Sequence, residues 1–181
     1  ARGIGFACAK AFIAEGARVA IISRRQETMD EALERLDGAI GETADLSDDT
    51  EALAALDRIE GQIGAIDILV NSAGAARRLP PDELSPQAYR AAMDAKFFTY
   101  VNVIDPLVKR LAARRTGVVV NVIGNGGKAP SPIHVAGGAA NAALMLVTAG
   151  LAAAYAPAGV RIVAINPGLT RTDRVEEGLA A

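Results

Sequence analysis

The segment from Ile133 to Met145 holds the only histidine of the chain, and this side chain could do acid–base chemistry. His134 stands three residues ahead of a glycine pair, and Asn141 is the single polar side chain in the alanine-rich run that follows. An imidazole can deliver a proton near neutral pH. The alternative is that His134 is a loop residue beside a helix that only packs. The surroundings of the segment decide between the two.

A second group of residues could bind a phosphate. Arg2-Gly3-Ile4-Gly5 has the composition of the end of a glycine-rich turn, in which the backbone approaches a pyrophosphate at the N-terminus of the next helix. About twenty residues later, Ser23-Arg24-Arg25 ends a β-branched run at the place where an acid would hold a ribose 2′-hydroxyl and an arginine suits a 2′-phosphate. Taken alone, these residues are equally compatible with an ordinary helix start and a solvated strand end.

Small polar residues also follow other apolar runs. Asn71-Ser72-Ala73-Gly74 comes directly after IDILV, Asp45-Leu46 ends another short segment, and Asn166-Pro167-Gly168 follows RIVAI. At the carboxyl ends of parallel strands, such residues leave room for a ligand in the crevice outside the sheet. Three such sites in this order predict a ligand site more specifically than any one of them.

The elements that must position these residues alternate along the chain. Val- and Ile-rich runs predict buried strands at 18–23, 66–70, 118–122 and 161–165. Helical patterns lie at 4–15, 27–36, 50–63, 86–114 and 137–155. This alternation predicts an α/β fold with a parallel sheet and right-handed crossovers, in one domain over residues 1–181. Because the chain opens on a turn entering a helix, we expect the first, central strand and the last strand to lie outside these residues, so that the domain is truncated at both ends.

Composition argues against several classes of function. Nineteen basic residues against twenty-one acidic ones leave no basic excess, so we expect no nucleic-acid partner. A single cysteine, Cys8, excludes an internal disulfide framework and fits a reducing cytoplasm. The run 137–156 is nearly uncharged, but it is mostly alanine and glycine and contains Asn141 and Thr148, so we expect no membrane span. A helix that is apolar all round is more simply buried within a soluble assembly.

With these motifs, the chain resembles the short-chain dehydrogenase/reductase family over essentially its whole length. The matching residues are RGIG at 2–5, ADL at 44–46, NSAG at 71–74 and NPGLTRT at 166–172. The resemblance implies a Rossmann-type doubly wound parallel sheet with helices on both faces. It also implies a nicotinamide cofactor, hydride exchange between a small-molecule carbonyl and an alcohol, and assembly into a homodimer or homotetramer.

The resemblance assigns cofactor contacts to the motif residues. Asp45 and Leu46 would flank the adenine, residues 71–74 would line the cofactor cleft with Pro167 and Gly168 in the last loop, and Thr172 would touch the nicotinamide amide. Arg2 and Arg24 occupy the two positions where basic residues favour the phosphorylated cofactor. We therefore expect NADP, with NAD also possible.

The catalytic positions of the family are all different in this chain. The family uses a serine after the VVVNV-like strand, a tyrosine and a lysine four residues apart at the next helix, and an asparagine in the preceding long helix. The matching positions here are Gly124, Gly137, Asn141 and Lys96. The usual proton donor, a tyrosine assisted by that lysine, therefore cannot form.

We predict that His134 and Lys96 take over the catalytic work. His134 lies one helical turn before Gly137, and Lys96 lies where the family's asparagine faces the active site. The imidazole would donate the proton, the ammonium would stabilise the developing alkoxide, and Asn141 could hydrogen-bond the nicotinamide ribose. The alternative for Lys96 is a solvated charge on a helix.

Three functions are compatible with the sequence. The first is an NAD(P)-dependent oxidoreductase with atypical acid–base residues. The second is an NADP-binding pseudoenzyme or regulatory binding protein without turnover, and the third is a cofactor-free scaffold that assembles through the alanine-rich helix. Cofactor binding separates the first two from the third, and turnover of simple ketones or alcohols separates the first from the second. We assign no metal site.

Overall fold

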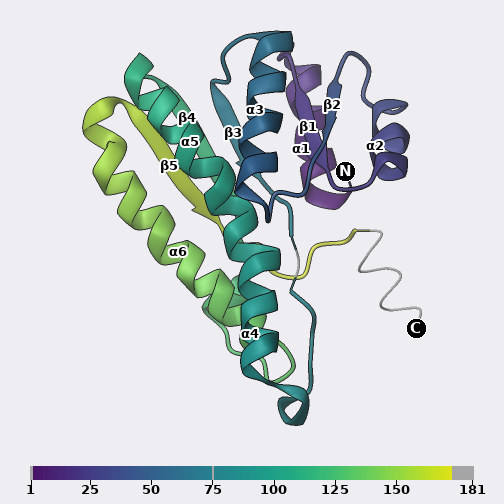
Figure 1. Cartoon of the computed structure of the whole chain (residues 1–181), viewed down its shortest axis with the longest axis vertical. Coiled ribbons are helices and arrows are strands. Elements are labelled where there is room, and N and C mark those ends of the chain that lie inside the picture. Colours follow the sequence, from purple (N-terminus) through teal and green to yellow (C-terminus); the bar gives the residue numbers. More distant parts are fainter. Residues whose placement is uncertain (1, 75, 173–181) are drawn as a thin grey trace.

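The computed structural model describes residues 2–74 and 76–172, in which parallel strands alternate with helices (Figure 1). The first part of the chain contains α1 (Gly3–Ala14), β1 (Ala20–Ser23), α2 (Gln26–Leu33), β2 (Ile40–Thr43) and α3 (Asp49–Ile63). The second part contains β3 (Ile68–Asn71), the short helix η1 (Pro81–Glu83), α4 (Pro86–Ala92), the π-helix η2 (Met93–Phe98), α5 (Thr99–Arg114), β4 (Gly117–Val122), η3 (Asn125–Gly127), α6 (Val135–Tyr155), η4 (Ala156–Ala158) and β5 (Val160–Ile165).

Every strand pair is parallel, which confirms the predicted Rossmann-type α/β fold. β1 pairs with β2, while β4 lies between β3 and β5. In the part of the chain that the structure describes, no strand joins β1 to β3. The start of α1 packs against the end of β3 instead, since a Cβ on Gly5 would lie 3.3 Å from the Cβ of Ser72. The carboxyl ends of the strands therefore meet the N-terminus of α1, as a ligand crevice requires.

Two segments differ from the elements predicted from the sequence. β2 was not expected, because its sequence IGET is short and contains Gly41; its pairing with β1 and the packing of Met29 of α2 onto Gly41 define it. The segment 86–114, predicted as one helix, is α4, a π-helix and α5 in succession. Single π-turns inside α-helices are frequent at functional sites.

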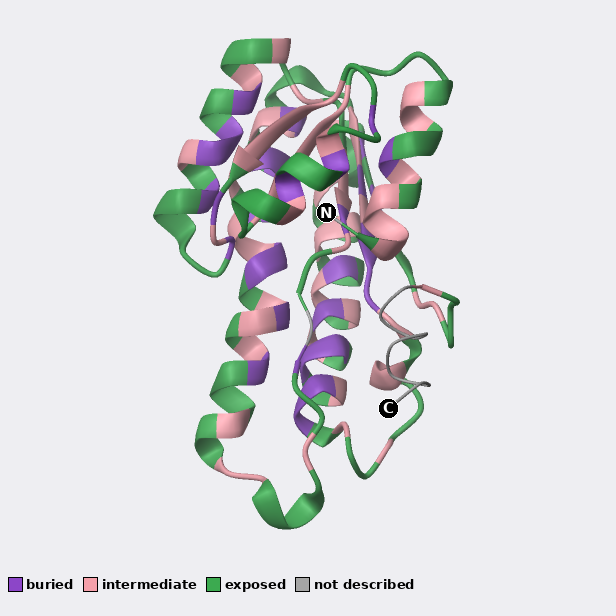
Figure 2. Cartoon of the chain, turned by 90° about the vertical axis from the view of Figure 1, so that its right-hand side faces the viewer, coloured by how far each residue is buried: buried purple, intermediate pink, exposed green. Residues whose placement is uncertain are grey.

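The main hydrophobic core lies between the sheet of β3, β4 and β5 and the helices α3, α5 and α6, whose inner faces are buried (Figure 2). Tyr100, Leu107 and Leu111 of α5 are fully buried against Val119 of β4. Burial of a large apolar side chain contributes about 1.5–3 kcal/mol. This packing fixes α5 on the sheet, and with it the π-helix that precedes α5.

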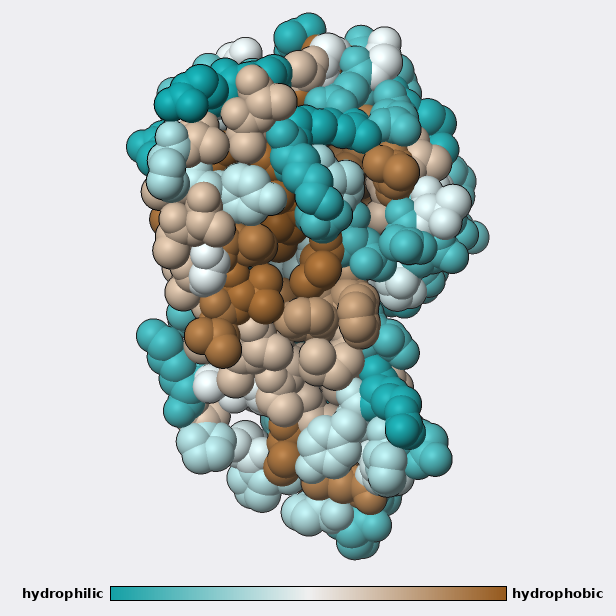
Figure 3. All heavy atoms as spheres, turned by 60° about the vertical axis from the view of Figure 1, so that its left-hand side comes forward, coloured by the Kyte–Doolittle hydropathy of each residue, from teal (hydrophilic) through white to brown (hydrophobic). Residues whose placement is uncertain are grey.

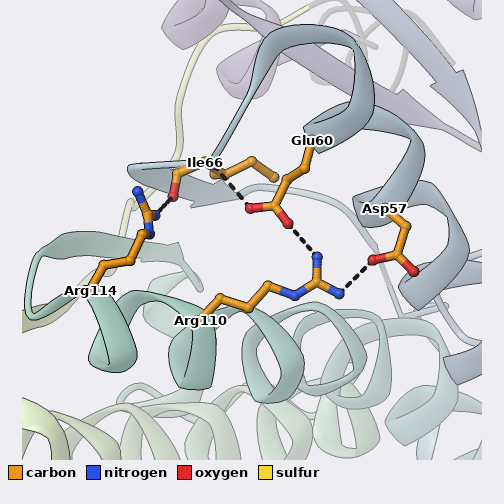
Figure 4. A network of polar contacts seen from close by, with 5 residues as sticks. All are labelled: Asp57, Glu60, Ile66, Arg110 and Arg114. Carbon is orange, nitrogen blue, oxygen red and sulfur yellow. Dashed lines mark hydrogen bonds and ion pairs between the residues drawn. The ribbon is translucent and has the colours of Figure 1, made fainter.

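Ionic contacts join α3 to α5 (Figure 4). The Arg110 guanidinium of α5 contacts Glu60 at 2.5 Å and Asp57 at 2.6 Å, both on α3. Glu60 also accepts a hydrogen bond from the Ile66 backbone N–H at 3.1 Å, and Arg114 donates to the Ile66 carbonyl oxygen. The segment entering β3 is therefore held by both helices, which fixes the strand that carries Asn71 at its end.

The helix α6 has a buried face and an exposed face. With the turn that follows it, over Val135–Ala158, it is long and apolar enough to cross a membrane by length and composition. One face packs against β5, η3 and the π-helix, and buries Leu144 and Thr148. The other face carries Leu146, which is 76% exposed. Figure 3 shows apolar residues gathered on the side of the molecule that carries α6 and β5.

Candidate active site

Lys96 is a buried cation at the end of β4. It lies in the π-helix Met93–Phe98 and is only 7% exposed, so its interpretation as a solvated helix charge is wrong. Its Nζ donates a hydrogen bond to the Tyr100 Oη at 2.9 Å and to the Val122 carbonyl oxygen at 3.3 Å. The same Nζ lies 4.5 Å from the centre of the Tyr100 ring. These contacts hold the ammonium at Val122, which lies two residues before Gly124 in the sequence.

Tyr100 is a neutral partner for this ammonium. Its hydroxyl donates to the Val122 carbonyl oxygen at 2.6 Å while accepting from Lys96. Burial raises the pKa of the Tyr100 phenol well above its usual range, because the phenolate would be poorly solvated. Tyr100 therefore stays protonated and positions Lys96. The sequence analysis missed this contact, although the spacing of four residues on a helix places such side chains on one face.

The π-helix contacts the NSAG segment directly. Gly74 has φ +79°, and a Cβ there would lie 2.2 Å from the Ala95 carbonyl oxygen and 3.0 Å from the Thr99 Oγ1. Thr99 in turn donates to the Lys96 carbonyl oxygen at 2.9 Å. Only glycine permits this approach. The end of the expected cofactor motif and the element that carries Lys96 thus form one wall.

His134 occupies the N-cap position of α6, and its ring lies on Gly137. A Cβ at position 137 would lie 2.2 Å from the His134 Cε1 and 2.7 Å from its Nε2. On its other side, the ring lies 3.1 Å from the Cβ position of Gly126, measured to Cδ2. The imidazole therefore fills the space into which a side chain at position 137 would extend. A side chain at position 137 would therefore displace the imidazole from this place.

The side chain of Asn141 points at the same glycine-containing turn. Asn141 is 6% exposed, and its Nδ2 lies 3.5 Å from the Cβ positions of both Gly124 and Gly126. Within residues 2–74 and 76–172, its amide makes no hydrogen bond. The structure thus brings His134 and Asn141 together at Gly126. Gly126 was not among the residues expected in the site.

The turn itself is in backbone contact with α6. A Cβ on Gly127 would lie 2.8 Å from the backbone nitrogen of Ala142, and a Cβ on Gly138 would lie 2.8 Å from the Gly126 carbonyl oxygen. Gly124 has φ +118°, a conformation that residues with a side chain rarely adopt. A serine at this position would therefore be strained.

The expected phosphate-binding residues surround the N-terminus of α1. Arg2 is the exposed N-cap residue and provides no side-chain cap for the N–H groups of the first turn. Gly3 has φ +59°, and its Cβ position lies 3.5 Å from the Cγ2 of Thr172. A cavity of about 510 Å³ lies here, lined among others by Arg35 and Arg171. The uncapped helix N-terminus and the arginines fit an anionic group such as a pyrophosphate.

The expected adenine end lies at the carboxyl ends of β1 and β2. The Asp45 carboxylate accepts hydrogen bonds from the Ser47 backbone N–H at 3.0 Å and from the Ser47 hydroxyl at 2.7 Å. These bonds, and to a smaller degree the charge of Arg24, lower the pKa of Asp45. Arg24 is exposed, whereas Leu46 is 8% exposed and belongs to the core. The side chain of Leu46 therefore packs in the core, and its carbonyl oxygen accepts a hydrogen bond from the Asn102 amide at 3.0 Å.

The loop after β5 reaches the glycine-containing turn. The Asn125 backbone N–H donates to the Pro167 carbonyl oxygen at 2.9 Å. Gly168 is exposed beyond it, and Thr172 lies against Gly3. This loop therefore runs from the turn beside His134 to the N-terminus of α1, and connects the two ends of the candidate site.

Comparisons with known proteins agree with this architecture. The family profile described as short chain dehydrogenase matches residues 1–180. A 3alpha-hydroxysteroid dehydrogenase of Mediterraneibacter gnavus is 32% identical over 180 residues, covering 96% of this chain and 72% of that protein. The D-threitol dehydrogenase of Mycolicibacterium smegmatis is 32% identical over 177 residues, covering 96% of this chain and 68% of that protein.

Among solved structures, the chain is similar to an NADPH-bound short chain oxidoreductase from Pseudomonas aeruginosa PAO1, which is described as containing an atypical catalytic center. The TM-score is 0.91 at 28% sequence identity, and the match covers 99% of this chain and 72% of that one.

Gly137→Ala should displace the imidazole, because the new methyl group would overlap the His134 ring. The chain has one histidine, so its imidazole gives a single set of NMR signals, which should shift. Gly150→Ala on the same helix is the matched control. No atom lies within 4 Å of its Cβ position, so this variant should be at least as stable as the parent. Unchanged imidazole signals in Gly137→Ala would contradict the packing.

Proposed function

Since the chain belongs to the short-chain dehydrogenase family of oxidoreductases, we propose that it reduces a small-molecule carbonyl to an alcohol with NADPH, using His134 and Lys96 as its acid–base residues. One observation carries the proposal. The His134 ring lies on Gly137, where the side chain of the family's tyrosine would begin. A group able to transfer a proton therefore lies beside the position from which the family's proton donor extends.

The residues at the strand ends fit a phosphorylated dinucleotide. The N-terminus of α1 with Gly3 and Gly5 would hold the pyrophosphate, and Asp45 would lie at the adenine. Arg2 and Arg24 are both exposed. Their charge would favour a ribose 2′-phosphate through charge-assisted hydrogen bonds.

The protein's own residues would manage the proton and the charge. Reduced nicotinamide, when bound, supplies a hydride to the carbonyl carbon. His134 as an imidazolium donates its proton to the carbonyl oxygen and ends as a neutral imidazole. The Lys96 ammonium, fixed on the Val122 carbonyl, stabilises negative charge that develops beyond the end of β4. Asn141 would contact the nicotinamide ribose.

The alternative is an NADP-binding protein without turnover. One observation favours it. Lys96 is hydrogen-bonded to Tyr100 and Val122 within the fold, and these contacts would stabilise the end of β4 in the absence of any reaction. In that case the cofactor would bind and no carbonyl would be reduced.

Cofactor preference tests the binding residues. NADPH should bind more tightly than NADH, and Arg24→Asp should remove the preference by about 10-fold or more, because it replaces a partner of the 2′-phosphate by a like charge. Fluorescence titration measures both affinities. Arg18→Asp, the same change at the opposite end of β1, should leave the preference unchanged. Equal affinities of the parent for NADPH and NADH would refute the assignment.

Turnover tests the acid–base residues. His134→Phe should lower the turnover number by about 10²-fold while NADPH affinity stays nearly unchanged. Lys96→Met should also lower turnover, whereas Lys128→Met, at an exposed lysine after η3, should not. Parent-like turnover in both His134→Phe and Lys96→Met would end the proposal, and NADPH binding without reduction of any carbonyl would favour the alternative.

Self-association is proposed for the exposed side of α6. Leu146 is 76% exposed on an otherwise apolar helix, and such a surface favours burial against a second copy. Light scattering at micromolar concentration should give the mass of a dimer or tetramer, and Leu146→Glu should reduce it to one subunit. Leu53→Glu, on α3, should have no effect. A parent mass of one subunit would contradict the proposal.

A further inference from the structure

The side-chain amide of Asn141 forms no hydrogen bond within the described parts of the chain. Its side chain is nine-tenths buried, yet in the described parts of the chain no residue hydrogen-bonds to it. The other buried asparagines of the domain are paired, since Asn71 donates to Asn121 at 2.9 Å and Asn121 donates to Thr148 at 2.9 Å. The Asn141 amide therefore keeps its hydrogen-bonding capacity, and an amide without a protein partner can bind a ligand that reaches it.

Two donors converge on one small space beside the turn. The Cβ position of Gly126 lies 3.5 Å from the Asn141 Nδ2 and 3.6 Å from the His134 Nε2. Because Gly126 carries no side chain, nothing of that residue fills the space between the amide and the imidazole. The same Nδ2 lies 3.5 Å from the Cβ position of Gly124, where the family has its serine. The amide therefore reaches the space that a serine side chain would have entered.

The backbone explains why the donor comes from α6. Gly124 has φ +118°, so a serine there would be strained. The close contact between η3 and the first turns of α6 brings position 141 near enough for an amide to reach the same space.

We infer that Asn141 is a further catalytic residue, whose amide N–H binds the carbonyl oxygen of the substrate beside His134. The inference rests on the proposed function. The amide has two ends, so its Oδ1 can still accept from a ribose hydroxyl while its Nδ2 faces the substrate. A ligand with a carbonyl oxygen is the chemical class that an N–H donor and an imidazolium recognise together.

The proton and electron balance follows from this arrangement. The carbonyl carbon gains a hydride from NADPH, and the π-electron pair of the carbonyl moves to its oxygen. The Asn141 N–H stabilises the negative charge on that oxygen, and the His134 imidazolium then gives it one proton. The alcohol contains one hydride and one proton more than the carbonyl, and His134 ends neutral.

Asn141→Asp tests the role of the N–H donor separately from that of the acceptor oxygen, because it keeps an acceptor oxygen and replaces the N–H donor. It should lower kcat/KM on the order of 10²-fold with NADPH affinity near that of the parent, whereas Asn141→Ala should lower both. Asn125→Asp is the matched control, at an exposed amide on the same turn, and should behave like the parent. Parent-like turnover of Asn141→Asp would overturn the inference.

A binding measurement tests the inference without turnover. Isobutyramide, an unreactive carbonyl compound, is added to the ¹⁵N-labelled protein with NADPH present, and the side-chain amide of Asn141 and the imidazole of His134 are followed by NMR. Both should shift together while the Asn125 amide does not. An Asn141 amide that stays unchanged overturns the inference, even where Asn141→Asp does not fold. A parent that reduces no carbonyl but shows the paired shifts defeats the proposed function and leaves the carbonyl-binding pair standing.

Discussion

The backbone contact between η3 and the first turns of α6 is the constraint on which the site depends. Side chains are absent at Gly127 and Gly138, so the two segments approach to distances at which a Cβ would overlap backbone atoms. This approach brings the side chains of His134, the N-cap residue of α6, and of Asn141, within α6, to the end of β4. Any other residue in the contact would push the helix away and separate them. The glycines thus determine where the polar groups lie, and they take no part in the chemistry themselves.

A second constraint fixes the cation. A buried ammonium needs acceptors to offset the loss of water, and Tyr100 and the Val122 carbonyl oxygen provide them. The π-helix turns Lys96 toward β4, and the Ala95 carbonyl of that turn meets Gly74. The cation, the end of β4 and the NSAG segment are therefore parts of one packed unit, and a change in one of them affects the geometry of the others.

The chain has the architecture of its family, and under the proposed function His134, Lys96 and Asn141 do the work of the family's catalytic residues. Glycine at 137 alone would leave a hole, but the imidazole of His134 fills it, and asparagine at 141 reaches toward Gly124. These contacts are the steric basis on which we propose an active site built from His134 and Asn141. The similarity to an oxidoreductase described as having an atypical catalytic center is consistent with this interpretation.

The sequence by itself determined the α/β class, the order of the elements and the motifs at the strand ends, because these follow from local periodicity and from short glycine-rich segments. It also predicted Lys96 and His134 as catalytic residues, Lys96 through the family position that it matches and His134 through its place one helical turn before Gly137. Only the tertiary structure decided that Lys96 is buried on Tyr100, that the segment 86–114 contains a π-helix, and that the His134 ring lies on Gly137. Each of these depends on contacts between residues of different elements, or on how a helix is packed against the sheet. Periodicity within one segment carries no information about such contacts.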